Sequence, residues 1–118
     1  MDASSYFQSG QIVSLDYDHK NLYTEVIQVV PAREMCWVRP LLMVNLTYNP
    51  PLVTDLRDAS DIFWPLNLFR PALDTEVISL LGEILSKEPK AESPSVAQQQ
   101  LHQFIQQIWQ AYQSSKEL

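Results

Sequence analysis

The chain is short of glycine, cysteine and positive charge. Among its 118 residues, the only glycines are Gly10 and Gly82, and the only cysteine is Cys36. Lys and Arg together number eight, whereas Asp and Glu together number fourteen. Two isolated glycines cannot build the glycine-rich loop with which proteins hold phosphate groups. One cysteine permits no intramolecular disulfide. The formal net charge of −6 repels nucleic-acid phosphates, so we expect no nucleic-acid partner.

Long apolar runs are also missing. No run exceeds four residues, as in LLMV at 41–44, which is far shorter than the roughly 20 residues that a membrane-spanning helix needs. No basic start followed by an apolar run suggests a signal peptide. We therefore expect a cytoplasmic protein without membrane insertion. A composition of 46% hydrophobic and 19% charged residues is typical of a globular domain, and the length fits one such domain.

The first half of the chain repeats with the two-residue period of β-strands. Turn residues interrupt it, notably at 18–21 and at 31–34. These signals predict five short strands, at 11–17, 22–30, 35–44, 52–57 and 61–65. Five short strands with tight turns are typical of a small antiparallel barrel or a curled sheet.

The third predicted strand is apolar on both faces. Alternation places Cys36, Val38, Leu42 and Val44 on one face, which we interpret as the core face, and Trp37, Leu41 and Met43 on the other. Pro40 lacks a backbone donor, so we expect an edge or a bulge at that point. A sheet open to solvent on one side is normally polar there. The outer face is therefore expected to be covered, either by helices or by another protein.

The second half changes to the period of amphipathic helices. One apolar stripe, starting after the expected cap Asp74, predicts a helix over 74–86; its members are Val77, Leu80, Leu81, Ile84 and Leu85. A second stripe predicts a helix over 95–112; its members are Ala97, Leu101, Phe104, Ile105, Ile108 and Tyr112. Glutamines cover the other faces of this second helix, and the polar residues 86–94 form a linker.

These elements predict an α+β fold, in which a small antiparallel β-barrel or curled sheet is followed by two C-terminal helices. We expect a flexible leader at 1–9, the barrel at 10–71, and a helical extension at 72–118 that packs on the barrel. All three segments belong to one domain.

Candidate catalytic residues do not assemble into a known pattern. His19 lies in a predicted turn and His102 in the second helix. A nucleophile pair of Cys36 and His19 would have to be created by folding, and Cys36 lies in an apolar stretch that is typical of a buried small hydrophobe. We therefore expect a protein that is not an enzyme and that needs no cofactor.

Three carboxylates, at Asp55, Asp58 and Asp61, offer oxygen ligands of the kind that hard cations prefer. However, Arg57 lies among them, and neither a downstream glutamate nor a turn glycine completes a calcium loop. We expect no metal site.

The stretch after these charges is rich in aromatic residues. Residues 61–70 read DIFWPLNLFR, and the part after Trp64 follows neither period. Such a connector either packs between the sheet and the first helix or stays exposed as a binding surface. Aromatic and arginine side chains anchor many protein interfaces. The candidate partner-binding residues are Trp37, Arg57, Asp61, Phe63, Trp64, Phe69 and Arg70.

The strand QIVSLDY, the hairpin around PARE and the short strand DIFWP together resemble an SH3-like small β-barrel over residues 10–71. The stretch DLRDASDIFWPLNLFRPALDTE is also similar to small uncharacterised proteins of oxygenic photosynthetic bacteria. The chain lacks the ALYDY-type start of signalling SH3 domains, so the resemblance does not carry over their binding of proline-rich peptides.

We expect a non-catalytic protein–protein interaction module, such as an adaptor, an assembly factor or a small subunit, that binds another protein or itself. The alternative is a regulatory domain that binds a small molecule in a pocket between barrel and helices. An open apolar patch favours the first hypothesis, and a closed apolar pocket with a few polar groups favours the second.

Overall fold

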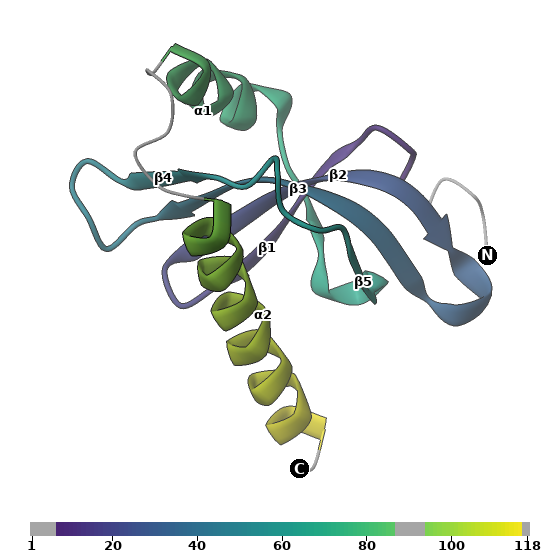
Figure 1. Ribbon diagram of the computed structural model, residues 1–118. Helices are drawn as coiled ribbons and strands as arrows, with labels where there is room; N and C mark the ends of the chain where they lie inside the picture. The colour runs from purple at the N-terminus through teal and green to yellow at the C-terminus, as the bar shows by residue number, and fades with distance from the viewer. Residues whose placement is uncertain (1–6, 87–93, 117–118) are drawn as a thin grey trace.

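The computed structural model describes residues 7–86 and 94–116, and these form an α+β fold (Figure 1). Six strands make one antiparallel sheet in the order β4-β3-β2-β1-β6, with β5 paired to β3 beside β4. The sheet is curled but does not close. The strands are β1 (Ile12–Tyr17), β2 (Lys20–Val30), β3 (Met35–Asn45), β4 (Leu52–Asp55), β5 (Ile62–Pro65) and β6 (Arg70–Pro71). The helices are α1 (Asp74–Ser86) and α2 (Pro94–Lys116).

This architecture confirms the predicted fold class, as the curled sheet and not as a closed barrel. The five predicted strands lie close to β1–β5, and the first predicted helix matches α1. The second helix extends to Lys116, beyond the expected end at 112. Strand β6 was not predicted, because its two residues, Arg70 and Pro71, are too few for any period to show.

The hairpin between β1 and β2 shows why turn residues stand at 18–21. Tyr17 pairs with Lys20, so the loop has two residues, Asp18 and His19, with φ angles of 50° and 62°. Two positive φ angles give the turn type that matches the right-handed twist of paired strands, and Asp tolerates that conformation well. The carbonyl of His19 also accepts a hydrogen bond of 2.7 Å from Leu46 N–H, which ties the turn to the end of β3.

A bulge in β3 overturns the predicted faces of this strand. Tyr23 pairs with Leu42 and Thr24 with Pro40, which leaves Leu41 as an extra residue. One extra residue reverses the alternation of the side chains that follow it. The expected bulge near Pro40 is therefore confirmed, but the expected single core face is wrong.

The reversed alternation gives the sheet an apolar cluster on each face. Before the bulge, Cys36 and Val38 point to the α2 side, and after it Met43 does. Leu42 and Val44 point to the α1 side, where Val77 packs on them. Figure 1 shows the two helices on opposite sides of the sheet.

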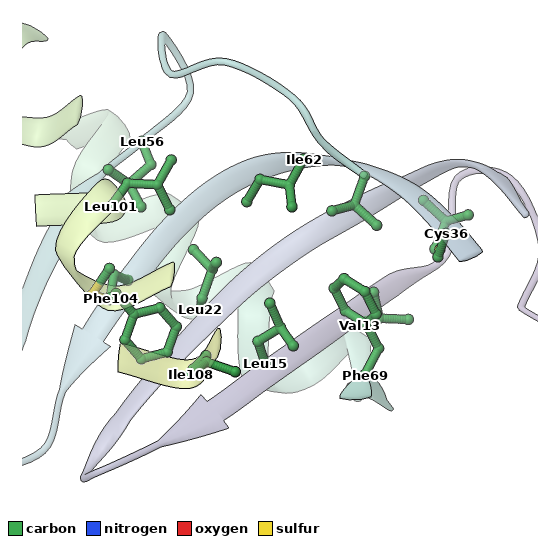
Figure 2. Packing of buried hydrophobic residues seen from close by; sticks show 13 residues of the cluster. Val13, Leu15, Leu22, Cys36, Leu56, Ile62, Phe69, Leu101, Phe104 and Ile108 are labelled. Atoms are coloured by element: carbon green, nitrogen blue, oxygen red, sulfur yellow. The ribbon is translucent and has the colours of Figure 1, made fainter. Parts of the chain in front are cut away.

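The larger cluster lies under α2. Figure 2 shows Phe104 and Ile108 of α2 pointing toward Leu22 and Leu15 of the strands. These side chains and those of the strands form one continuous apolar cluster between α2 and the sheet. Side chains of both helices thus pack on the sheet, those of α2 in the larger cluster and Val77 of α1 in the smaller one.

The expected leader at 1–9 falls mostly outside the described residues. Its described part is attached to the sheet: Phe7 packs against the larger cluster, and the Ser9 hydroxyl donates to the Ile27 carbonyl at 2.8 Å. Gly10 N–H donates to Val26 O at 2.8 Å, with the positive φ of 87° that glycine adopts easily. Most of the expected linker, residues 87–93, also lies outside the described part.

Candidate interaction surface

Two aromatic side chains stand next to each other on an uncovered part of the sheet. Trp37 of β3 lies directly opposite Phe63 of β5 in the antiparallel register. Their exposed fractions are 40% and 46%. Both point to the α1 side, because their neighbours Cys36 and Trp64 point to the α2 side. Helix α1 packs near Leu42, beyond the bulge, and so leaves this end of the face open to solvent.

Polar groups hold the Trp37 ring in one orientation. Its indole Nε1–H donates to Asp61 Oδ2 at 3.0 Å, and Arg39 Nε lies 3.7 Å from Asp61 Oδ1. Asp61 precedes β5 and Arg39 lies two residues after Trp37 on β3, so the strand pairing brings all three together. The result is an aromatic pair with a charged rim. We call Trp37, Phe63, Arg39 and Asp61 the aromatic surface.

Trp64 points to the other side of the sheet. Its ring centroid lies 6.0 Å from that of Trp109 on α2, and Trp109 lies 5.9 Å from Tyr112. Trp109 is 43% exposed and was not among the candidate residues. One signal in the sequence was available: Trp109 is an aromatic residue outside the apolar stripe of its helix.

The remaining candidates lie elsewhere. Phe69 is 7% exposed and belongs to the core, so it is not part of any surface. Arg57 pairs with Asp55 in the turn after β4, with Nη2 to Oδ2 at 2.8 Å. Arg70 lies on β6 at the start of α1. The structure thus brings together Trp37, Asp61 and Phe63, and separates them from Arg57, Phe69 and Arg70.

Arg70 belongs to a polar network that attaches α1 to the sheet. Its guanidinium pairs with Asp16 and, at 3.2 Å, with Glu76 Oε1. The Tyr23 hydroxyl donates to the same carboxylate oxygen at 2.8 Å. Leu73 N–H donates to Glu76 Oε2 at 2.9 Å, so Glu76 also binds the backbone amide that immediately precedes α1.

This network explains the titration of its members. The Leu73 amide, then Arg70 and Tyr23, favour the charged carboxylate and lower the pKa of Glu76 to about 2. Burial, followed by the hydrogen bond to Glu76, raises the pKa of Tyr23. Asp16 is the main cause that raises the pKa of Arg70. The shifts of Glu76 and Arg70 thus come mainly from their hydrogen-bond partners, whereas that of Tyr23 comes mainly from burial.

Cys36 is fully buried, at 0% exposure, and burial raises the pKa of its thiol to about 11. A neutral, buried thiol is a poor nucleophile. His19 lies in the turn before β2, whereas Cys36 pairs with Val29 near the far end of that strand. The two residues are therefore separated by most of the length of β2. Among the described residues, no cluster of three or more His, Cys, Asp or Glu is placed to bind a metal.

Two grooves lie between strands and helices. One of about 240 Å³ runs between β5 and α2, lined by Asp61, Ile62, Trp64, Leu101, His102 and Ile105 among others. The other, of about 320 Å³, lies between α1 and the β3–β4 hairpin, lined by Tyr23, Val44, Pro51, Val53, Glu76 and Leu80 among others. Both grooves are open to solvent along their length.

Comparisons of the chain with protein-family models, with curated proteins and with solved structures found no match. Within residues 7–86 and 94–116, no helix has both the length and the apolar character needed to cross a membrane.

Proposed function

We propose that the protein is a non-catalytic interaction module that binds another protein through the aromatic surface. The observation that carries this proposal is the pairing of Trp37 with Phe63, two large aromatic side chains held together on a part of the sheet that neither helix covers. Isolated exposed apolar residues are common and need no explanation, but contiguous apolar patches mark interaction sites, and Trp is enriched among the residues that anchor them.

The geometry of the surface suits this role. Trp37 is already fixed by its hydrogen bond to Asp61, so binding costs little side-chain entropy. Asp61 and Arg39 supply charges of both signs at the rim, where they set the orientation of a partner more than its affinity. An adaptor, an assembly factor or a small subunit of a complex would use such a surface.

Capture from native extract tests the proposal. Wild-type protein, Trp37→Ala and Phe63→Ala are immobilised, with Tyr48→Ala as matched control, because Tyr48 is also an exposed aromatic residue but lies at the β3–β4 turn. The proposal requires a protein that wild type and Tyr48→Ala retain and that both other variants lose. Retention by all four proteins would refute it. The same samples are compared for self-association by analytical ultracentrifugation.

The groove between α1 and the β3–β4 hairpin favours a second candidate function, the binding of a small molecule. Its volume of about 320 Å³ falls at the lower end of the range for ligand sites. Tyr23, Val53 and Leu80 give it apolar walls, and Glu76 and Glu83 give it negative charge. A thermal-shift screen with small cationic and aromatic compounds tests this candidate. A true ligand would stabilise wild type but not Ser79→Trp, which fills the groove.

A further inference from the structure

One edge of β5 carries no partner strand in the described part of the chain, where β5 pairs with β3 alone. Leu66 N–H donates to Glu34 O at 2.8 Å, which places these residues at a hydrogen-bonding position of the ladder, while Glu34 N–H itself donates to Pro31 O. Such pairs alternate along an antiparallel ladder, so Trp64 and Cys36 form the next one. Phe63 follows on the other side of Trp64, opposite Trp37, at a non-hydrogen-bonded position, and therefore directs its backbone N–H and C=O away from β3.

Pro65 limits what this edge can pair with. It occupies the next outward-facing position of β5 after Phe63, and it has no N–H to donate. Proline at such a position is a common protection of edge strands against indiscriminate pairing. Within β5, Phe63 is therefore the residue that offers both an outward donor and an outward acceptor. An added strand has one register in which it can bond to both groups.

The groove of about 240 Å³ lies along the same edge, with α2 as its opposite wall. Ser60 N–H donates to Gln98 Oε1 at 3.3 Å near one end, and Trp64 contacts Trp109 near the other. These two contacts, one near each end of the groove, fix the distance between α2 and β5. Leu101 and Ile105 of α2 make the wall apolar.

We infer that this edge receives an extended segment of a partner protein as an additional strand beside β5. The inference rests on the proposed function and specifies how the partner binds. Side chains of an added strand alternate between two faces. On one face they would contact Phe63, and on the other they would enter the groove beside Ile105. Main-chain bonds to Phe63 would supply affinity, and the two apolar contacts would supply specificity.

Charge selects the chemistry of this segment. The groove contains the carboxylate of Asp61 and neither a lysine nor an arginine. The whole chain has a formal net charge of −6, which repels acidic segments and a second copy of itself alike. The fitting segment therefore has apolar residues at alternate positions and a net positive charge.

The test begins with short linear peptides displayed on phage and selected on the whole protein. The best peptide is then synthesised and titrated against Phe63→Ala and Phe63→Pro. Both variants lose the ring, but only proline also removes the N–H, and that N–H makes no bond to β3. We expect binding of the peptide to Phe63→Pro to be about tenfold weaker than to Phe63→Ala, the loss for roughly one hydrogen bond. His102→Lys places a positive charge at an exposed position of the groove, and this variant should therefore bind the basic peptide more weakly than wild type does.

If Phe63→Pro fails to fold, amide hydrogen exchange in the wild-type protein gives an independent test of the same hydrogen bond. The Phe63 amide should exchange rapidly in the free protein and be protected when the peptide is added. The inference is overturned if no peptide is selected, if the peptide leaves this amide unprotected, or if a dimer sensitive to Phe63→Pro shows that a second copy occupies the edge. Capture that needs Trp37 but is equal in the two Phe63 variants would overturn strand addition and leave the proposed function intact.

Discussion

Phe63 and Phe69 are the same residue type six positions apart, and the structure assigns them opposite roles. Phe63 is 46% exposed on the aromatic surface, whereas Phe69 is 7% exposed and packs among the core residues around Val13. Replacing each by alanine therefore separates a surface contribution from a core contribution. The two variants form a matched pair, because the chemical change is identical.

The expected magnitudes differ severalfold. Truncating a core phenylalanine to alanine costs roughly 3–5 kcal/mol of unfolding free energy, since a cavity remains where the ring was. A domain of this size has a total stability of about 5–15 kcal/mol, so Phe69→Ala removes a large part of it. Phe63 buries about half of its ring, and its loss should cost about 1 kcal/mol. At about 4 °C per kcal/mol, Tm should fall by about 12–20 °C in Phe69→Ala and by about 4 °C in Phe63→Ala.

Urea unfolding, followed by circular dichroism, measures both values. We expect a lower midpoint for Phe69→Ala with little change in the slope of free energy against urea, which would show that the native state is destabilised and not reorganised. Equal losses in the two variants would refute the assignment of Phe63 to the surface and of Phe69 to the core.

Three further predictions concern buried and titrating groups. Cys36 should react slowly with a thiol reagent in the native protein and rapidly in denaturant, because it is buried and its pKa is raised to about 11; fast native labelling would contradict its position. Glu76 has a pKa lowered to about 2 from 4.5, so its contribution to stability is present above pH 4.5 and is lost as the pH falls toward 2. Glu76→Gln should flatten the dependence of unfolding free energy on pH in that window, and an unchanged slope would argue against the network. Tyr23→Phe removes the hydroxyl bond to Glu76 and should cost about 1 kcal/mol in urea unfolding, whereas no loss would show that the bond contributes nothing.

The order of strands and helices followed from the sequence because hydrophobic periods are strong local signals. The turn at 18–21 and the stripe that begins at Val77 illustrate this. Each depends on neighbouring residues, and each was found where expected. The period of a segment, however, says nothing about which face of it meets the rest of the protein.

Three features depended on contacts between distant segments and could not be derived in full from local patterns. The bulge at Leu41 was signalled by Pro40, but its effect on the faces of β3 depends on the pairing with β2. Phe69 follows no period, so its place in the core is decided by β6 pairing with β1. Trp109 lies off the apolar stripe of its helix, and its contact with Trp64 arises only because α2 packs beside β5.

The aromatic surface was predicted in part. Trp37 and Phe63 were both among the candidate binding residues, and both are exposed. Sequence alone did not identify which of Phe63, Trp64 and Phe69 would accompany Trp37. That choice depends on the register between β3 and β5, which places Phe63 opposite Trp37.

The most direct test of the central claim is made on one variant, Trp37→Ala, by measuring both its Tm and its affinity for the captured partner. An interface anchor typically contributes about 2 kcal/mol or more to binding, which corresponds to at least about thirtyfold in Kd. The account predicts a loss of this size with a Tm within a few degrees of wild type. A collapse of Tm, or an unchanged Kd, would contradict the claim that Trp37 and Phe63 form the surface through which this protein binds its partner.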